Sequence, residues 1–184
     1  GAIPADAKLK VVTTTEDLAA LAREVGGDRI EVTAIAKGYQ NPHFVEAKPS
    51  YLLKLRNADL LIAVGLELEV GWLPALLQQS RNPKLLGKGL GYLDVSAGCD
   101  ILERQTGPVS RAQGDVHPFG NPHYWLDPRN GWMIAEGIAS RLSELSPADA
   151  PYFRSRAEAF RKRLDEAARS WEDRMRPYRG TKVV

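Results

Sequence analysis

Apolar and polar positions along the first hundred residues predict strands that alternate with helices. Four apolar, β-branched stretches have the length and composition of strands, at residues 8–14, 29–36, 59–64 and 91–95. Three helices are predicted between them, at residues 15–25, 50–57 and 68–80. The stretch 59–64 is apolar at nearly every position, as in a parallel strand that is buried on both faces.

This alternation predicts an α/β fold, in which helices flank a parallel sheet and the crossovers between strands are right-handed. In such sheets ligands bind beyond the carboxyl ends of the strands, so the loop that follows the second strand is a candidate site. Residues 87–120 are rich in glycine and have a weaker pattern. Within them, 101–104 is compatible with a short strand.

Two longer helices are predicted in the last third of the chain. The first runs to about Leu145, with Asp127 as its N-cap and Pro128 at its first position. The second, over 147–176, carries apolar residues three and four positions apart, namely Phe153, Ala157, Phe160, Leu164, Ala167, Trp171 and Met175. At roughly 40 Å it is longer than a domain of this size needs. Two interpretations stay open, a solvated surface helix and a spine shared with a second domain.

Composition and charge exclude several classes of protein. The 184 residues carry a net charge of +2, with no cluster of basic and aromatic residues, so nucleic acid is not an expected partner. No apolar run approaches the ~20 residues of a transmembrane segment. The single cysteine, Cys99, excludes an internal disulfide and a Cys-rich zinc module.

The three histidines lie in two stiff loops that share the tripeptide Asn-Pro-His. His43 ends the first copy, and His123 ends the second, which lies in a Gly- and Pro-rich loop that also holds His117. Proline fixes the backbone that enters each histidine, and a metal site requires imidazoles that are held in place before the ion arrives. The pattern therefore predicts a site for Zn²⁺ or Mn²⁺, both of which accept imidazole.

Oxygen ligands for such a site are less well indicated. Glu46, Asp115 and Asp127 are candidates, although Glu46 is expected to be exposed and Asp127 to cap its helix. Glu67 and Glu69 follow the third strand and are interpreted as solvated carboxylates at a helix start rather than the lining of a cleft.

Other chemistry is poorly supported by the sequence. Tyr124 and Trp125 are expected to anchor the His123 loop in the core rather than to contact a ligand. The chain has no Gly-x-Ser-x-Gly elbow, Walker loop or His-Glu-x-x-His helix. The glycines of 87–91 lie in no strand-to-helix turn, so phosphate binding is not expected.

Taken together, these segments resemble the solute-binding proteins of zinc and manganese ABC transporters. The resembling pieces occur in the family's order, at residues 11–14, 26–32, 41–43, 48–50, 57–61 and 121–128. The resemblance implies that His43 and His123 are metal ligands and leaves His117 as an accessory candidate. It also implies two α/β lobes joined by one long helix, with the metal between the lobes.

The organisation implied by this resemblance has four parts. Residues 1–7 are a processed or disordered start, 8–146 an N-terminal metal-binding lobe, 147–179 the linking helix, and 180–184 the beginning of a second lobe. A strand is expected to begin in that last segment, so the chain is interpreted as part of a longer protein that supplies the remaining ligands.

The function implied is capture of a divalent metal rather than catalysis. We expect a periplasmic or extracellular binding protein that takes up Zn²⁺, with Mn²⁺ as the second choice, and delivers it to an ABC transporter permease. Two alternatives stay open: a metal-dependent hydrolase, which requires a nearby general base, and an adhesin or interaction lobe in which the metal is incidental.

Overall fold

The fold is built on a sheet of four parallel strands. A computed structural model describes residues 8–87, 89–104 and 118–182. Strands β1 (Leu9–Thr13), β2 (Ile30–Ala34), β3 (Leu60–Ala63) and β4 (Tyr92–Asp94) lie in the order β2-β1-β3-β4. All four predicted strands are therefore present, and the α/β prediction is confirmed.

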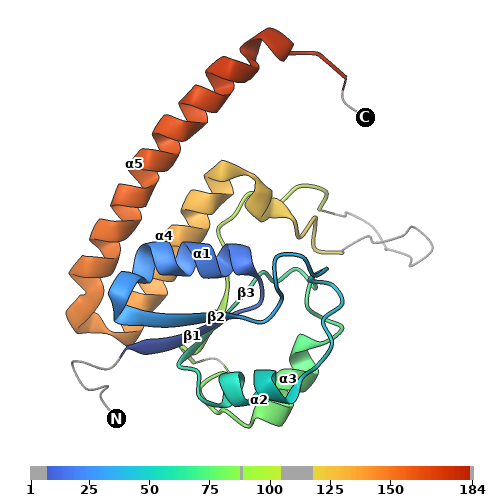
Figure 1. Cartoon of the computed structure of the whole chain (residues 1–184), viewed down its shortest axis with the longest axis vertical. Coiled ribbons are helices and arrows are strands. Elements are labelled where there is room, and N and C mark those ends of the chain that lie inside the picture. Colours follow the sequence, from blue (N-terminus) through green and yellow to red (C-terminus); the bar gives the residue numbers. More distant parts are fainter. Residues whose placement is uncertain (1–7, 88, 105–117, 183–184) are drawn as a thin grey trace.

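Helices cover both faces of this sheet (Figure 1). α1 (Glu16–Gly26), α4 (Pro128–Leu145) and α5 (Ala150–Met175) lie on one side, while α2 (Pro49–Arg56) and α3 (Leu73–Ser80) lie on the other. Because successive side chains of a strand point to opposite faces, β3 contributes to both core layers. Leu60 and Ile62 pack towards α1 and α4, and Leu61 and Ala63 pack towards α2 and α3.

Local sequence signals account for the limits of α1. The Thr15 hydroxyl accepts a hydrogen bond from the Leu18 amide at 3.3 Å, which confirms it as the N-cap. Gly27 ends the helix with φ +52°, and a Cβ there would lie 2.3 Å from the Tyr152 hydroxyl. The positive φ favours glycine at this position, next to side chains of α5.

Two predicted elements differ from the structure. The third helix begins at Leu73 rather than at residue 68, because Gly65, Leu66 and Glu67 have φ values of +80°, +53° and +64°. This left-handed backbone cannot be part of a right-handed helix, and residues 66–72 form turns instead. Residues 101–104 form no strand.

The last helix leaves the lobe as it proceeds. Phe153 and Ala157 in its first two turns are buried, whereas Trp171 and Met175 near its end are 48% and 63% exposed. Its 26 residues span about 39 Å at 1.5 Å per residue. The last turns of α5 therefore stand clear of the sheet and its helices (Figure 1).

No helix within the described ranges is long and apolar enough to cross a membrane. The predicted N-terminal segment 1–7 and the end of the predicted final strand, 183–184, lie outside the described residues.

Candidate metal centre

The His43 loop leaves the carboxyl end of β2 and is held by two hydrogen bonds. The side-chain carbonyl of Asn41 accepts a hydrogen bond from the His43 amide at 3.0 Å, which forms a turn around Pro42. The indole Nε1–H of Trp72, just before α3, donates to the Pro42 carbonyl at 2.9 Å. Trp72 lies at the end of the turn that follows β3, and it thus fixes a loop that is 30 positions earlier in the sequence.

The second Asn-Pro-His copy forms the same turn. The Asn121 side-chain carbonyl accepts from the His123 amide at 3.0 Å and lies 2.9 Å from His123 Nδ1. An amide oxygen can only accept hydrogen bonds, so this contact places a proton on Nδ1 of the His123 ring. The Nε2 lone pair of His123 is then available to a metal ion.

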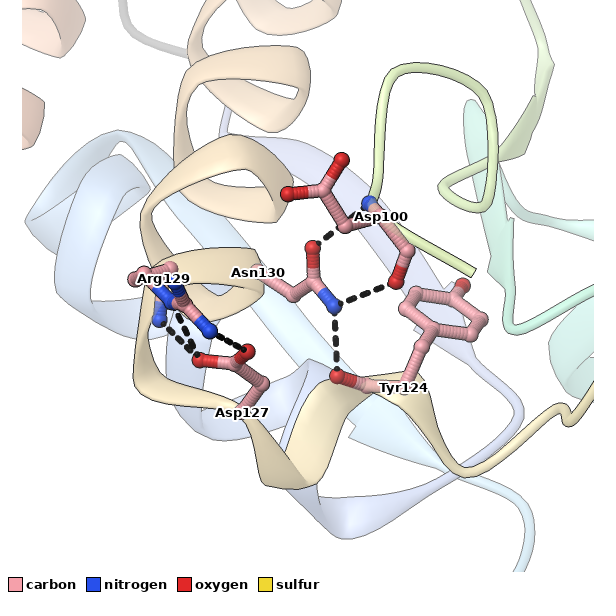
Figure 2. A network of polar contacts seen from close by, with 5 residues as sticks. All are labelled: Asp100, Tyr124, Asp127, Arg129 and Asn130. Carbon is pink, nitrogen blue, oxygen red and sulfur yellow. Dashed lines mark hydrogen bonds and ion pairs between the residues drawn. The ribbon is translucent and has the colours of Figure 1, made fainter. Parts of the chain in front are cut away.

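Buried polar contacts anchor the His123 loop to the sheet. The Tyr124 hydroxyl donates to the Val64 carbonyl at 2.6 Å, and burial raises the pKa of Tyr124 far above its usual range, so the hydroxyl keeps its proton. The Asn130 amide nitrogen donates to the carbonyls of Tyr124 at 3.0 Å and Asp100 at 2.9 Å, as Figure 2 shows. The expected anchoring role of Tyr124 is confirmed.

These two loops bring His43 and His123 together at the carboxyl edge of the sheet, although 80 positions separate them in the sequence. Their Nε2 atoms lie 3.4 Å apart, with ring planes inclined at 47°. In a tetrahedral Zn²⁺ site with Zn–N bonds of about 2.0–2.1 Å, two ligand nitrogens are separated by roughly 3.3 Å. The pair therefore has the spacing of two imidazoles on one such ion.

The other predicted ligands that the structure describes are not drawn into this pair. Asp127 caps α4 by accepting from the Arg129 amide at 2.9 Å, and its carboxylate pairs with the Arg129 guanidinium at 3.0 Å (Figure 2). This hydrogen bond with Arg129 lowers the pKa of Asp127. Glu46 is exposed, as expected. His117 and Asp115 lie outside the described residues. Within the described ranges, no group of three or more ligating side chains is preformed.

The prediction that Glu69 is a solvated carboxylate is wrong. Glu67 is solvated as predicted, but Glu69 is only 4% exposed, and its carboxylate accepts hydrogen bonds from the amides of Val64 at 2.8 Å and Gly65 at 3.1 Å. Burial raises the pKa of Glu69 against the lowering effect of the Thr14 hydroxyl and of these amides. The left-handed turn folds Glu69 back under the end of β3.

Trp72 and Asn130 were also not identified from the sequence. Trp72 belongs to an apolar run that indicates core packing, and Asn130 lies in the first turn of α4, where asparagine is common. Their partners lie far away in the sequence, at Pro42 and at Asp100, so no local pattern indicates these contacts.

Known proteins resemble this chain in sequence. The family model described as zinc-uptake complex component A, periplasmic, matches residues 11–184. The manganese ABC transporter substrate-binding lipoprotein PsaA of Streptococcus mitis is 28% identical over 170 residues, covering 91% of this chain and 52% of PsaA. The metal ABC transporter substrate-binding lipoprotein FimA of Streptococcus parasanguinis is 31% identical over 165 residues, covering 88% and 50%. The chain thus spans about half the length of these relatives.

Solved structures share the fold. A zinc-bound deletion mutant of ZnuA superposes with a TM-score of 0.79 at 23% identity, covering 93% of this chain and 60% of that one. The Mn-bound periplasmic metal-binding protein from Candidatus Liberibacter asiaticus gives 0.71 at 21% identity, covering 92% and 57%. These likenesses confirm the predicted architecture of a sheet lobe followed by a long helix.

Proposed function

The chain belongs to the family of periplasmic zinc-uptake components, and on that premise we propose that it captures a divalent transition metal for an ABC transporter. Zn²⁺ is the preferred cargo and Mn²⁺ the alternative. His43 and His123 bind the ion through Nε2, and an ABC transporter permease receives it. The protein acts outside the cytoplasmic membrane, in the periplasm or the extracellular space, and is not an enzyme.

The observation that carries this proposal is the separation of 3.4 Å between the two Nε2 atoms. Two imidazoles at this spacing can both bind one cation that accepts nitrogen ligands, and a tetrahedral ion fits the gap. The proton on His123 Nδ1, held by Asn121, leaves Nε2 free for the metal. The relatives PsaA and FimA are named as manganese and metal ABC transporter substrate-binding lipoproteins, and these names support the same class of cargo.

Two imidazoles leave at least two positions of a tetrahedral ion unfilled. We propose that residues 8–146 are one wall of the site, that 147–179 link this lobe to a second one, and that 180–184 begin the second lobe. His117 is proposed as an accessory ligand from the same wall.

A hydrolase has less support, because two carboxylates considered for the site, Asp127 and Glu69, are engaged elsewhere. Asp127 is paired with Arg129, and Glu69 is hydrogen-bonded to backbone amides. Neither is available as the general base that a metal-bound water requires.

The test is calorimetric titration of the 184-residue chain with Zn²⁺ and with Mn²⁺. Removal of either principal histidine, by His43→Ala or His123→Ala, is expected to weaken Zn²⁺ binding by more than about tenfold, since each supplies one of the two nitrogens. His117→Ala should have a smaller effect, as expected of an accessory ligand. Unchanged affinity in the double variant His43→Ala/His123→Ala would show that the site lies elsewhere.

A further inference from the structure

The end of β3 is the point at which both histidine loops are tied to the sheet. The Val64 carbonyl accepts from the Tyr124 hydroxyl at 2.6 Å, and Tyr124 is the neighbour of His123. The turn that begins at Gly65 ends at Trp72, whose indole donates to the Pro42 carbonyl beside His43. The positions of both imidazoles therefore depend on the placement of residues 64–72.

This turn is conformationally unfavourable by itself. Leu66 and Glu67 both have left-handed φ values, which side-chain-bearing residues rarely adopt. A turn of this kind persists only where other contacts hold it. Backbone hydrogen bonds within the turn include one from the Leu68 amide to the Gly65 carbonyl at 3.1 Å. Another runs from the Val70 amide to the Glu67 carbonyl at 3.3 Å.

Glu69 supplies the missing restraint from inside the turn. One carboxylate oxygen accepts from the Val64 amide and the other from the Gly65 amide, so the side chain fixes the first residues of the turn. The Glu69 carbonyl accepts from the amides of Trp72 at 3.2 Å and Leu73 at 2.9 Å, so its backbone fixes the last residues. At 4% exposure, the carboxylate is confined to this geometry.

We propose that Glu69 is a positioning residue of the metal site, which sets the separation of His43 and His123 by holding residues 64–72. This inference rests on the proposed function, in which the two histidines bind the metal. Glu69 touches neither histidine and supplies no ligand. It acts through Val64 and Tyr124 on one loop and through Trp72 on the other.

The test replaces the carboxylate by an amide of the same shape, Glu69→Gln, in the 184-residue chain. The amide retains one acceptor, but its NH₂ group faces a second backbone N–H donor, so one of the two restraints is lost. Zn²⁺ affinity is expected to fall by about tenfold, within the range seen when outer partners of metal ligands are removed. The visible absorption of bound Co²⁺, which depends on coordination geometry, is expected to change as well.

Asn82→Ala is the matched control. Asn82 is also 4% exposed, and its side chain is also held by backbone hydrogen bonds, to the carbonyls of Leu55 and Ala58 at 2.8 Å and from the Lys84 amide at 3.0 Å. These bonds lie before the amino end of β3, away from the histidines. The variant is expected to lose stability and to keep the Zn²⁺ affinity and the Co²⁺ spectrum. Glu69→Gln with unchanged affinity and spectrum, whatever its stability, would overturn the inference.

A second variant tests the route of the coupling and serves if Glu69→Gln does not fold. Tyr124→Phe removes only the hydroxyl that binds Val64 and is expected to change affinity and the Co²⁺ spectrum in the same direction. Because both residues act through Val64, the double variant should lose less than the sum of the two single losses. An unchanged spectrum in Tyr124→Phe would contradict the proposed route.

Failure of the inference can be told from failure of the proposed function. If the unmodified chain binds no Zn²⁺, or if His43→Ala/His123→Ala binds it normally, the proposed function is wrong and the inference falls with it. If the unmodified chain binds Zn²⁺ through these histidines and Glu69→Gln matches it, only the inference is wrong.

Discussion

At the scale of single residues, one tripeptide occurs twice and has the same local structure both times. In each Asn-Pro-His copy the asparagine side chain accepts from the histidine amide at 3.0 Å, which turns the backbone and presents the imidazole. In the second copy the Asn121 side-chain carbonyl also lies 2.9 Å from Nδ1 of the His123 ring. Asn121 therefore orients the His123 ring in addition to the loop.

This ring contact predicts that removal of Asn121 weakens metal binding. Asn121→Ala should weaken Zn²⁺ binding by about tenfold, because the His123 ring loses the acceptor that fixes its proton on Nδ1. Asn121→Asp, which keeps an oxygen acceptor at this position, should lose less. Calorimetric titration of both variants provides the comparison. An Asn121→Asp loss equal to that of Asn121→Ala would contradict the role given to the ring contact.

A second residue-scale prediction concerns Asp127, for which two roles were weighed. If it is a helix cap, Asp127→Ala should lower the free energy of unfolding by about 1 kcal/mol, the usual cost of removing an N-cap. Asp127→Asn, which keeps a capping oxygen, should lose less. Zn²⁺ affinity should stay unchanged in both, and urea denaturation with calorimetry tests each point. A marked loss of affinity in Asp127→Asn would favour the ligand role instead.

At the scale of elements, the start of α5 is fastened to the end of α1 by polar groups. The Tyr152 hydroxyl donates to the Asp28 carboxylate at 2.6 Å, and the Arg156 guanidinium donates to the Glu24 carbonyl at 2.8 Å. The Arg29 and Arg156 guanidinium groups also lie 5.4 and 5.7 Å from the centre of the Tyr152 ring. These contacts hold the first turns of a helix whose last turns leave the lobe.

The Asp28 contact predicts a pH dependence. The hydrogen bond from Tyr152 lowers the pKa of Asp28 below its ordinary 3.8. A carboxyl with a lowered folded-state pKa binds its proton more weakly when folded, so its stabilising contribution is complete above 3.8 and disappears as the pH falls through the folded value. Unfolding in urea should therefore require less denaturant as the solution is acidified below 3.8.

Asp28→Asn provides the control for this pH dependence. The amide can still accept from Tyr152 but cannot titrate, so the variant should lack the part of the acid destabilisation that comes from Asp28. Identical pH profiles of the unmodified chain and Asp28→Asn would show that the contact contributes nothing measurable.

At the scale of the whole molecule, the chain that carries the histidine pair and the protruding helix spans about half the length of these relatives. The pair lies at the carboxyl edge of the sheet, where loops from β2 and from the start of α4 meet. Ion binding at this edge would join two loops that are separated by 80 residues. Cargo binding should therefore be coupled to the stability of the entire lobe.

This coupling predicts that Zn²⁺ stabilises the folded chain. A ligand that binds only the native state at about 100 times its Kd adds about 2.7 kcal/mol to the free energy of unfolding. The melting temperature should rise with free Zn²⁺ and return to its starting value when a chelator is added. His43→Ala/His123→Ala should melt at the same temperature with and without Zn²⁺, and an equal rise in that variant would indicate binding at other residues.

The sequence by itself determined most of the secondary structure. Strand and helix periods, the Thr15 and Asp127 caps and the glycines after α1 are local signals, because they depend on hydrogen bonds and side-chain directions within a few residues. The parallel sheet followed from their alternation. The helix start at Leu73 was missed because the turn before it is left-handed at two residues that carry side chains, and no pattern of apolar positions indicates such a backbone.

Only the tertiary structure decided how the candidate site is assembled. Histidine, asparagine and proline in two loops indicated a metal site, but the distance of 3.4 Å between the imidazoles depends on the packing of both loops at one edge of the sheet. The burial of Glu69 depends likewise on the turn after β3. Contacts between residues 60 or 80 positions apart are set by the packing of whole elements, which local sequence patterns do not encode.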